Sequence, residues 1–487
     1  MNELRTILKA EAHRLERENA PQMEADPWRM KFHLMPPTGW MNDPNGLCQF
    51  HGIYHVFFQY TPYDAGGGLK VWGHYSSRDL IGWEYHGVCL TPDSPYDVSG
   101  VYSGSALIDG DAMVLYYTGN VKYDGDYDYV ESGREGNTIM VTSPDGFQMG
   151  DKICVLRPQD YPHDYTCHIR DPKVWKENGQ YYMVLGGRKK GDKGAILLYS
   201  SADGREWKLE REFSSQEDFG YMWECPDFFC LDGQWIAAFS PQGVGRQETA
   251  FQNIYHSGYV MIPSPLAWDS KGESGGMRTL PVERFREWDM GFDFYAPQTF
   301  LDEAGRRILV GWIGLPDGDK EYQNPTVERG WQHALTLPRE VTRRGKMLCQ
   351  YPVGELKALR GEEIPLEQGQ AIVDSGCFDL VVCGKPGESC RIAIHGGLVF
   401  SWRDGMAALE LSPELGRGRA ARRAQVESLW EVRILADASV AEIYVNGGET
   451  VFTTRYYPDH TAASVSVFWP GSQTNLWTMG GFSLIRR

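Results

Sequence analysis

The chain has 487 residues, which is enough for two or three hydrophobic cores. Its 48 Lys and Arg residues against 65 Asp and Glu residues give a formal net charge of −17, and such a field disfavours nucleic acid and anionic membranes as partners. Aromatic residues make up 13% of the chain and glycine is abundant, a composition typical of all-β proteins and not of helical or disordered ones.

The first 30 residues predict a helical extension ahead of the main fold. Residues 1–20 are strongly charged, place apolar side chains on one helical stripe, and lack the continuous apolar stretch of a secretory signal. No apolar run elsewhere is long enough for a transmembrane helix. The ten cysteines form no C-x-x-C pair, which is typical of reduced thiols. We therefore expect a cytoplasmic protein, either a monomer or a homodimer.

One unit recurs five times in the next part of the chain: an apolar or aromatic run, a tight turn containing Gly or Asp, and a second apolar run. Each copy predicts a β-hairpin. The copies span residues 47–58, 106–118, 174–185, 228–239 and 299–312. Their spacing leaves room for four strands per repeat, so we expect a five-bladed β-propeller over residues 31–345. A plain β-sandwich assembled from hairpins is the alternative.

After residue 339 the repeat ends and a second all-β region begins. Strands are expected at residues 372–382, 391–400, 430–435 and 440–456, the last with a turn at Asn446-Gly447. We expect these strands to form a β-sandwich domain over residues 350–487. The predicted fold is therefore all-β, a five-bladed propeller followed by a sandwich.

An acidic residue stands just ahead of three of the predicted hairpins. These residues are Asp43, Asp171 and Glu224. Their positions are equivalent in a propeller, so we expect the three carboxyl groups to converge at one end of the central channel. Carboxylates held close together raise at least one pKa, which gives a site one carboxylic acid and one carboxylate at neutral pH. That combination is what glycoside cleavage requires.

The motifs around these acids resemble the invertase and β-fructofuranosidase family, glycoside hydrolase family 32, from about His33 to the C-terminus. The segments that carry the resemblance are residues 40–46, 57–60, 72–74, 102–106, 170–173, 224–227, 293–298 and 337–340, together with residues 437–443 in the expected sandwich.

This resemblance implies a role for each acid. Asp43 matches the nucleophile that attacks the anomeric C2 of a fructosyl unit, Glu224 matches the acid/base, and Asp171 matches the transition-state stabiliser. The resemblance also implies a set of substrate-binding positions: Asn42, Gln59, Ser103 and Arg170 at the fructosyl ring, Tyr102 in the same motif as Ser103, and Trp312 in the pocket wall. Independently of the family, a cation at Arg170 is expected to keep the neighbouring Asp171 ionised.

One segment departs from the family pattern. Many relatives carry an extra Trp shortly before the Trp-Gly-His motif, where this chain reads Gly-Gly-Gly-Leu-Lys-Val at residues 66–71. We expect Trp72 to replace that pocket wall in part. The local sequence around Lys70 looks most like the bacterial intracellular branch, whose members include sucrose-6-phosphate hydrolases.

The predicted activity is that of a retaining β-fructofuranosidase, which splits sucrose or sucrose 6-phosphate by double displacement. One enzymatic alternative is an exo-acting fructan or fructo-oligosaccharide hydrolase with the same acids, and another is an inverting arabinan- or xylan-cleaving propeller enzyme. The non-enzymatic alternative is a carbohydrate-binding protein with an inactive pocket. Neither a cofactor nor a metal ion is predicted, since glycoside hydrolysis requires neither.

Overall fold

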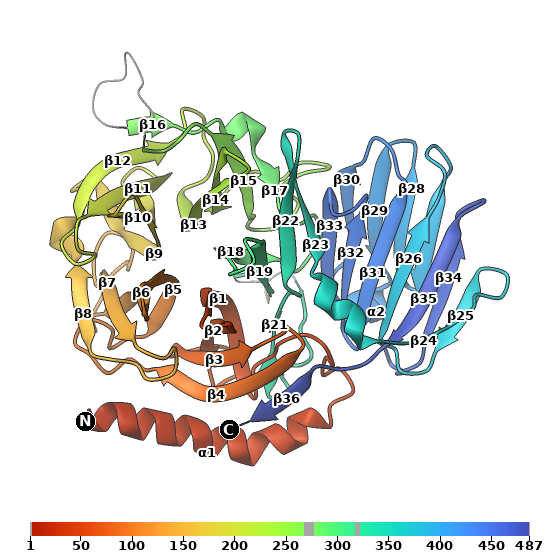
Figure 1. Ribbon diagram of the computed structural model, residues 1–487, viewed down its shortest axis with the longest axis horizontal. Helices are drawn as coiled ribbons and strands as arrows, with labels where there is room; N and C mark the ends of the chain where they lie inside the picture. The colour runs from red at the N-terminus through yellow and green to blue at the C-terminus, as the bar shows by residue number, and fades with distance from the viewer. Residues whose placement is uncertain (1, 267–276, 317–321, 487) are drawn as a thin grey trace.

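Most of the structure consists of β-sheets. The computed structural model describes residues 2–266, 277–316 and 322–486, and within these ranges five sheets surround a common axis while two more face each other beside the ring (Figure 1). The expected fold class is confirmed: the chain forms a five-bladed β-propeller followed by a β-sandwich.

The propeller sheets follow the chain in order. The first contains β1 (Gly39–Phe50), β2 (Ile53–Thr61), β3 (Val71–Ser77) and β4 (Gly82–Leu90), with β20 (Trp331–Gln332) and β36 (Ser483–Arg486) at its edges. The second contains β5 (Val101–Asp109), β6 (Ala112–Lys122), β7 (Arg134–Ser143) and β8 (Lys152–Leu156). The third contains β9 (Tyr165–Glu177), β10 (Gln180–Lys189), β11 (Lys193–Ser201), β12 (Lys208–Ser214) and β16 (Met277–Thr279). The fourth contains β13 (Met222–Leu231), β14 (Gln234–Gln242), β15 (Gly258–Ile262) and β17 (Arg286–Glu287). The fifth contains β18 (Tyr295–Leu301), β19 (Arg307–Ile313), β21 (Ala334–Leu335), β22 (Arg339–Arg344) and β23 (Met347–Pro352).

The five expected hairpins are the inner strand pairs of these sheets, and their turns explain the sequence signal. The pair β9 and β10 turns at Asn178 and Gly179, with φ of 52° and 82°. The pair β13 and β14 turns at Asp232 and Gly233, with φ of 48° and 74°. Two successive residues with positive φ fit the right-handed twist of the flanking strands, which is why Asn-Gly and Asp-Gly recur there.

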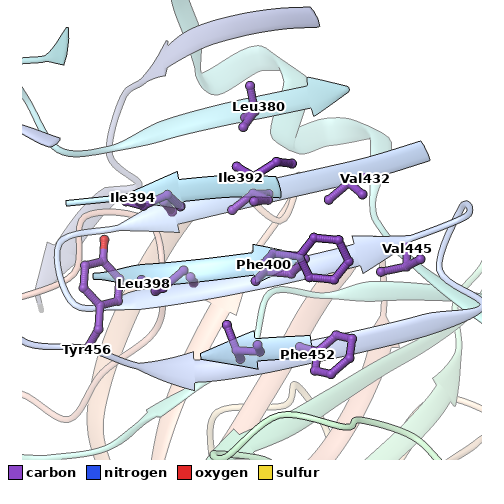
Figure 2. Packing of buried hydrophobic residues seen from close by; sticks show 14 of the residues in the cluster. Leu380, Ile392, Ile394, Leu398, Phe400, Val432, Val445, Phe452 and Tyr456 are labelled. Atoms are coloured by element: carbon purple, nitrogen blue, oxygen red, sulfur yellow. The ribbon is translucent and has the colours of Figure 1, made fainter. Parts of the chain in front are cut away.

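Two six-stranded sheets pack face to face in the sandwich. One contains β24 (Arg360–Glu363), β26 (Phe378–Cys383), β31 (Glu431–Asp437), β32 (Val440–Val445), β33 (Thr450–Arg455) and β35 (Gln473–Met479). The other contains β25 (Gln370–Val373), β27 (Cys390–Ile394), β28 (Leu398–Arg403), β29 (Met406–Leu411), β30 (Ala421–Gln425) and β34 (Ala463–Phe468). Figure 2 shows side chains of both sheets meeting in one core, among them Leu380, Ile392, Phe400 and Phe452, all buried. Alternate residues of the central strands, such as Phe378, Leu380 and Val382 of β26, supply this apolar layer.

Some sequence-based boundaries were wrong. The expected strands 372–382 and 391–400 are each interrupted by a turn, where Gly376 and Gly396 adopt φ of 69° and 68°. We expected the propeller to end at residue 345 and the sandwich to extend to residue 487, but β23 pairs with β22 in the fifth sheet. The last strand, β36, pairs in parallel with β4 of the first sheet.

Both ends of the described chain lie on the first sheet. The long helix α1 (Glu3–Glu24) begins at Asn2, whose side chain accepts a hydrogen bond from the backbone N–H of Leu4 at 3.1 Å. It packs beside β4, where the hydroxyl of Tyr85 donates to Glu16 at 2.6 Å. Within the described ranges, no helix combines the length and apolar character needed to cross a bilayer. The other helical segments in this part of the chain are short: α2 (Pro413–Gly416) and 3-10 turns at Pro158–Asp160, Val282–Arg284 and Gly354–Leu359.

A buried network of charges joins the propeller to the sandwich. Arg339 of β22 donates to Glu442 of β32 at 2.7 Å and to Asp289 at 3.1 Å. His33, ahead of the first sheet, lies 3.1 Å from Glu442 and 2.9 Å from Asp437. All these side chains are buried. Burial opposes ionisation, but Arg339 and His33 nevertheless lower the pKa of Glu442 to about 2.

Candidate active site

The innermost strand of each blade carries a β-bulge at the same place. The strands β1, β5, β9, β13 and β18 contact one another around the ring. Their pairing registers shift at residues 42–43, 102–103, 171–172, 225–226 and 296–297. A bulge inserts an extra residue, bends the strand and redirects a side chain. The bulges therefore gather side chains from distant parts of the sequence at one end of the ring.

Backbone strain and proline mark three of these bulges. Asp171, Cys225 and Ala296 have φ of 64°, 47° and 46°, and a proline follows each of them. Proline has no N–H group to pair, so it is tolerated where a bulge interrupts the ladder. Non-glycine residues with positive φ are uncommon and cluster at functional sites.

A chain of hydrogen bonds holds Asp43 at the first bulge. The amide of Asn42 donates to Asp43 Oδ1 at 3.0 Å and to Gln59 Oε1 at 2.7 Å. Gln59 in turn donates to the hydroxyl of Ser103 at 2.6 Å, and Ser103 donates to Asp43 Oδ2. Burial raises the pKa of Asp43 above its ordinary value, while the hydrogen bonds from Ser103 and Asn42 lower it in part. The second bulge thus supplies a donor to the carboxylate of the first.

Asp171 contacts Cys225 of the fourth blade. Its Oδ2 accepts a hydrogen bond from the backbone N–H of Cys225 at 3.0 Å. The Cys225 thiol lies 3.6 Å from the same oxygen and 3.9 Å from Asp43 Oδ2. Burial raises the pKa of Asp171 to about 7, with Arg170 acting against the increase and Glu224 adding to it. Burial and the surrounding carboxylates also raise the pKa of Cys225 well above its ordinary value, which disfavours the reactive thiolate form.

Four hydrogen bonds converge on Glu224. Arg170 donates to Oε1 from Nε at 2.9 Å and from Nη2 at 2.6 Å. Oε2 accepts from the Gln242 amide at 2.7 Å and from the Tyr295 hydroxyl at 2.6 Å. His168 Nδ1 accepts a hydrogen bond from Arg170 Nη1 at 2.6 Å. Burial and the nearby arginines lower the pKa of His168 to about 2, so its ring is neutral. The carboxyl groups of Glu224 and Asp43 thus have different hydrogen-bond partners.

The structure brings the three acids together with four of the expected binding residues: Asn42, Gln59, Ser103 and Arg170. The ion-pair partner of Arg170 differs from the one expected. We expected its charge to hold Asp171 ionised. The guanidinium forms its ion pair with Glu224 of the next blade, because the bulge after residue 170 turns the two neighbouring side chains in different directions, but its charge still acts to lower the pKa of Asp171.

Trp72 does not form a pocket wall. Its side chain is 0% exposed in the core between the first two blades, and its indole N–H donates to the carbonyl oxygen of Tyr102 at 3.0 Å. The segment of residues 66–71 instead places the ammonium of Lys70 over the Trp40 ring, 4.7 Å from its centroid. Burial lowers the pKa of Lys70 to about 7, against the opposing effect of Asp43. This region therefore presents a cation beside Trp40.

Trp312 and Tyr102 lie at different depths around these acids. The Trp312 ring is buried, with ring centroids 6.0 Å from Trp40 and 6.4 Å from Tyr295. Tyr102 is half-buried, and the guanidinium carbon of Arg134 lies over its ring, 5.3 Å from the Tyr102 ring centroid.

Sequence reasoning missed three residues that surround Glu224 and Arg170. Tyr295 lies within a motif that the sequence singled out, and its position just before the Ala-Pro bulge is the signal that could have found it. Gln242 ends β14 and His168 precedes Arg170 by two residues, and neither stands out by residue type. Their roles depend on which strands are neighbours in space.

Comparison with known protein families agrees with this geometry. The N-terminal domain of the glycosyl hydrolases family 32 matches residues 33–352, and the C-terminal domain of that family matches residues 406–479. The chain belongs to glycosyl hydrolase family 32. It is therefore a glycoside hydrolase by family, with both characteristic domains of family 32 present in one chain.

Individual family 32 relatives cover nearly the whole chain. The sucrose-6-phosphate hydrolase of Bacillus subtilis (strain 168) is 37% identical over 97% of this chain and 98% of its own length. The raffinose invertase of Escherichia coli is 36% identical over 91% of this chain and 92% of its own length. Among solved structures, a Bombyx mori family 32 β-fructofuranosidase superimposes with a TM-score of 0.83 at 29% identity, covering 98% of this chain and 99% of the other. The sucrose-6-phosphate hydrolase from Lactobacillus gasseri gives 0.82 at 26% identity, covering 96% and 97% of the two chains.

Proposed function

We propose that the protein is a retaining β-fructofuranosidase that hydrolyses sucrose or sucrose 6-phosphate, with Asp43 as nucleophile, Glu224 as acid/base and Asp171 as transition-state stabiliser. The observation that carries the proposal is the ring of bulges that gathers these acids while giving each a different environment. The names of the relatives support the substrate class.

The reaction would proceed in two displacements. In the first, an Asp43 oxygen forms a bond to C2 of the fructosyl unit while the C2–oxygen bond to the leaving sugar breaks, and Glu224 transfers its proton to that oxygen. In the second, Glu224 takes a proton from water, whose oxygen bonds to C2 and releases Asp43. Asp171 would hold fructosyl hydroxyls as positive charge develops on the ring.

The surroundings of Glu224 suit the second step more than the first. Four donors point at its two oxygens, and a protonated carboxyl group accepts fewer hydrogen bonds than a carboxylate. We therefore expect substrate to draw part of the Arg170 guanidinium away from Glu224 and onto the fructosyl hydroxyls. That movement would leave Glu224 able to carry the proton that the leaving oxygen needs.

The decisive experiment replaces the nucleophile. Asp43→Ala should lower kcat on sucrose by at least about 10³-fold, because the covalent route disappears, while circular dichroism and the unfolding midpoint confirm a folded protein. Asp111→Asn, an exposed acid in the β5–β6 turn, is the matched control and should retain full activity. Substantial activity of Asp43→Ala on both sugars would remove Asp43 from the nucleophile role.

Stereochemistry tests the retaining mechanism separately. NMR of the first-formed fructose anomer should show the same configuration as the substrate, since two displacements at C2 restore it. An inverted first product would mean that Asp43 acts as a base toward water.

We also propose a cytoplasmic location. All ten cysteines are free thiols, and several of them are partly or fully exposed, such as Cys230 and Cys383. Exposed free thiols persist in reducing compartments. Fractionation of the native host with an antibody against this chain would test the proposal.

A further inference from the structure

Arg134 is a half-buried cation without a carboxylate partner. It begins β7, and its guanidinium lies over the Tyr102 ring, 5.3 Å from the centroid. Nε donates to the side-chain oxygen of Asn120 at 2.8 Å. Within the described ranges, Nη1 and Nη2 donate to no protein group and no Asp or Glu oxygen lies within 4.0 Å. A planar guanidinium thus keeps the two terminal nitrogens that form paired hydrogen bonds to an oxyanion.

Three other cations of this region are already paired. Arg170 is bound to Glu224, Arg188 donates to Asp192 at 2.6 Å, and Lys189 donates to Glu212 at 2.6 Å. Arg134 therefore differs from these three cations in having charge available for a ligand. Leaving a partly desolvated guanidinium without an anion costs free energy, which an anionic ligand would recover.

Arg134 lies on the leaving-group side of the site. Burial and the Arg170 guanidinium lower its pKa, and the Glu224 carboxylate acts in the opposite direction, so both groups are its electrostatic neighbours. The fructosyl side is formed by the network of Asn42, Gln59 and Ser103 around Asp43. Because Glu224 would protonate the departing oxygen, the departing sugar must extend from Glu224 away from that network.

Arg134 also lines a cavity. It has a volume of about 210 Å³ and lies between the second and third blades. Thr166, Cys167 and the exposed Lys190 line it together with Arg134, and Glu131 is the acid in its wall. The lining thus offers the cations of Arg134 and Lys190 to an anion, whereas the Thr166 hydroxyl is already donated to the carbonyl oxygen of Arg188 at 3.0 Å.

We propose that Arg134 binds the phosphate group of a leaving hexose 6-phosphate, through paired hydrogen bonds from Nη1 and Nη2, and so selects phosphorylated sucrose over sucrose. This inference rests on the proposed function and adds the residue that sets substrate choice. Arg134 is a binding residue for the leaving group and takes no part in proton transfer.

Side-by-side kinetics on sucrose and sucrose 6-phosphate test the proposal. The unmodified enzyme should prefer sucrose 6-phosphate in kcat/KM by about 10-fold or more, the value expected for charge-assisted hydrogen bonds. Arg134→Gln should lose about 10-fold or more on sucrose 6-phosphate, mostly in KM, and stay within about 2-fold on sucrose. Arg134→Lys keeps the positive charge but loses the paired N–H donors of the guanidinium. Its kcat/KM on sucrose 6-phosphate should fall between those of the unmodified enzyme and Arg134→Gln.

Arg157→Gln is the matched control, because Arg157 also lies over a tyrosine ring, at 4.5 Å from the centroid of Tyr96, on the exposed exterior of the propeller. This variant should leave kcat/KM on both substrates unchanged.

Product inhibition gives a second readout that does not depend on turnover of the phosphorylated sugar. Glucose 6-phosphate should inhibit sucrose hydrolysis more strongly than glucose in the unmodified enzyme, and equally in Arg134→Gln.

Three results would overturn the inference. The first is equal kcat/KM of the unmodified enzyme on the two sugars, and the second is an unchanged preference in Arg134→Gln. The third is an equal loss of kcat/KM on both sugars in Arg134→Gln, which would mean that Arg134 only supports Glu224. Each leaves the proposed function standing if Asp43→Ala is inactive. Failure of the proposed function would appear instead as activity of Asp43→Ala on both sugars.

Discussion

Burial acts unequally on the side chains of this site. Glu224 receives donors from three side chains, whereas the Asp171 carboxylate accepts a backbone N–H and a thiol contact at Cys225. With so little hydrogen-bond compensation, burial raises the pKa of Asp171 to about 7. Ionisation of Asp171 in the folded protein is therefore unfavourable.

Asp171→Asn should stabilise the fold, and the gain should grow with pH. A folded-state pKa above the unfolded one means that the folded state binds more protons between about pH 4 and pH 7, so the stability contribution of Asp171 falls across that window and is fully lost above pH 7. Replacing it with Asn removes this penalty. We expect the gain in unfolding free energy to be about 2 kcal/mol larger at pH 8 than at pH 5.

Thermal or urea unfolding of Asp171→Asn and the unmodified enzyme at the two pH values measures this difference. The exposed Asp111→Asn variant serves as control and should show the same stability change at both. An equal gain for Asp171→Asn at pH 5 and pH 8 would contradict the raised pKa.

Residue identities were easier to predict than their contacts. Asp43, Asp171 and Glu224 could be singled out because each stands at a fixed place ahead of a hairpin, a pattern that is local in sequence. The partner of Arg170 and the burial of Trp72 could not, because both depend on the direction in which a strand turns a side chain. A bulge changes that direction without a unique sequence mark.

Among the elements, hairpins were predictable and edge strands were not. Turns such as Asn178-Gly179 are encoded by residues that tolerate positive φ, so sequence alone indicates them. Short strands such as β20 and β36 carry little periodic signal, and their sheet partners lie hundreds of residues away in the chain. The contact between propeller and sandwich is equally nonlocal: it brings β22 against β32 through Arg339 and Glu442.

Arg339→Met should destabilise the protein by about 3–5 kcal/mol. The substitution leaves Glu442 and Asp289 as buried carboxylates without their cation, and removing one partner of a buried pair has a cost of this size. Arg343→Met, four residues further along β22 and exposed, should change stability by less than about 0.5 kcal/mol.

Urea unfolding with separate probes for the two domains would measure the effect of Arg339→Met and also reveal any loss of coupling between them. A midpoint equal to that of Arg343→Met would mean that the network contributes nothing to stability.

At the scale of the whole molecule, the two ends of the chain secure the same blade. Figure 1 shows β36 running between the first sheet and α1. β36 pairs with β4 from Ser483 to Arg486, and Arg486 forms an ion pair with Glu24 of α1 at 2.7 Å. The sandwich is thereby attached to the propeller at a second place, far from Arg339.

Deleting residues 483–487 should lower the melting temperature while leaving kcat/KM on sucrose within about 2-fold. The deletion exposes the backbone edge of β4, an outer strand that contributes no residue to the site. Because β36 is short and its side chains are exposed, we expect a loss of about 1–2 kcal/mol. Differential scanning fluorimetry and initial rates measure the two quantities. An unchanged melting temperature, or a large loss of activity, would contradict this view of β36.

Closure of the ring has a consequence for the order in which the protein is synthesised. β20 pairs with β1 and β21 pairs with β19, so residues 331–335 connect the fifth blade to the first. Asp43, Asp171 and Glu224 all leave the ribosome long before these residues do. A nascent chain that already carries all three acids therefore lacks the strands that close the ring, and we expect hydrolysis only after translation has passed these strands.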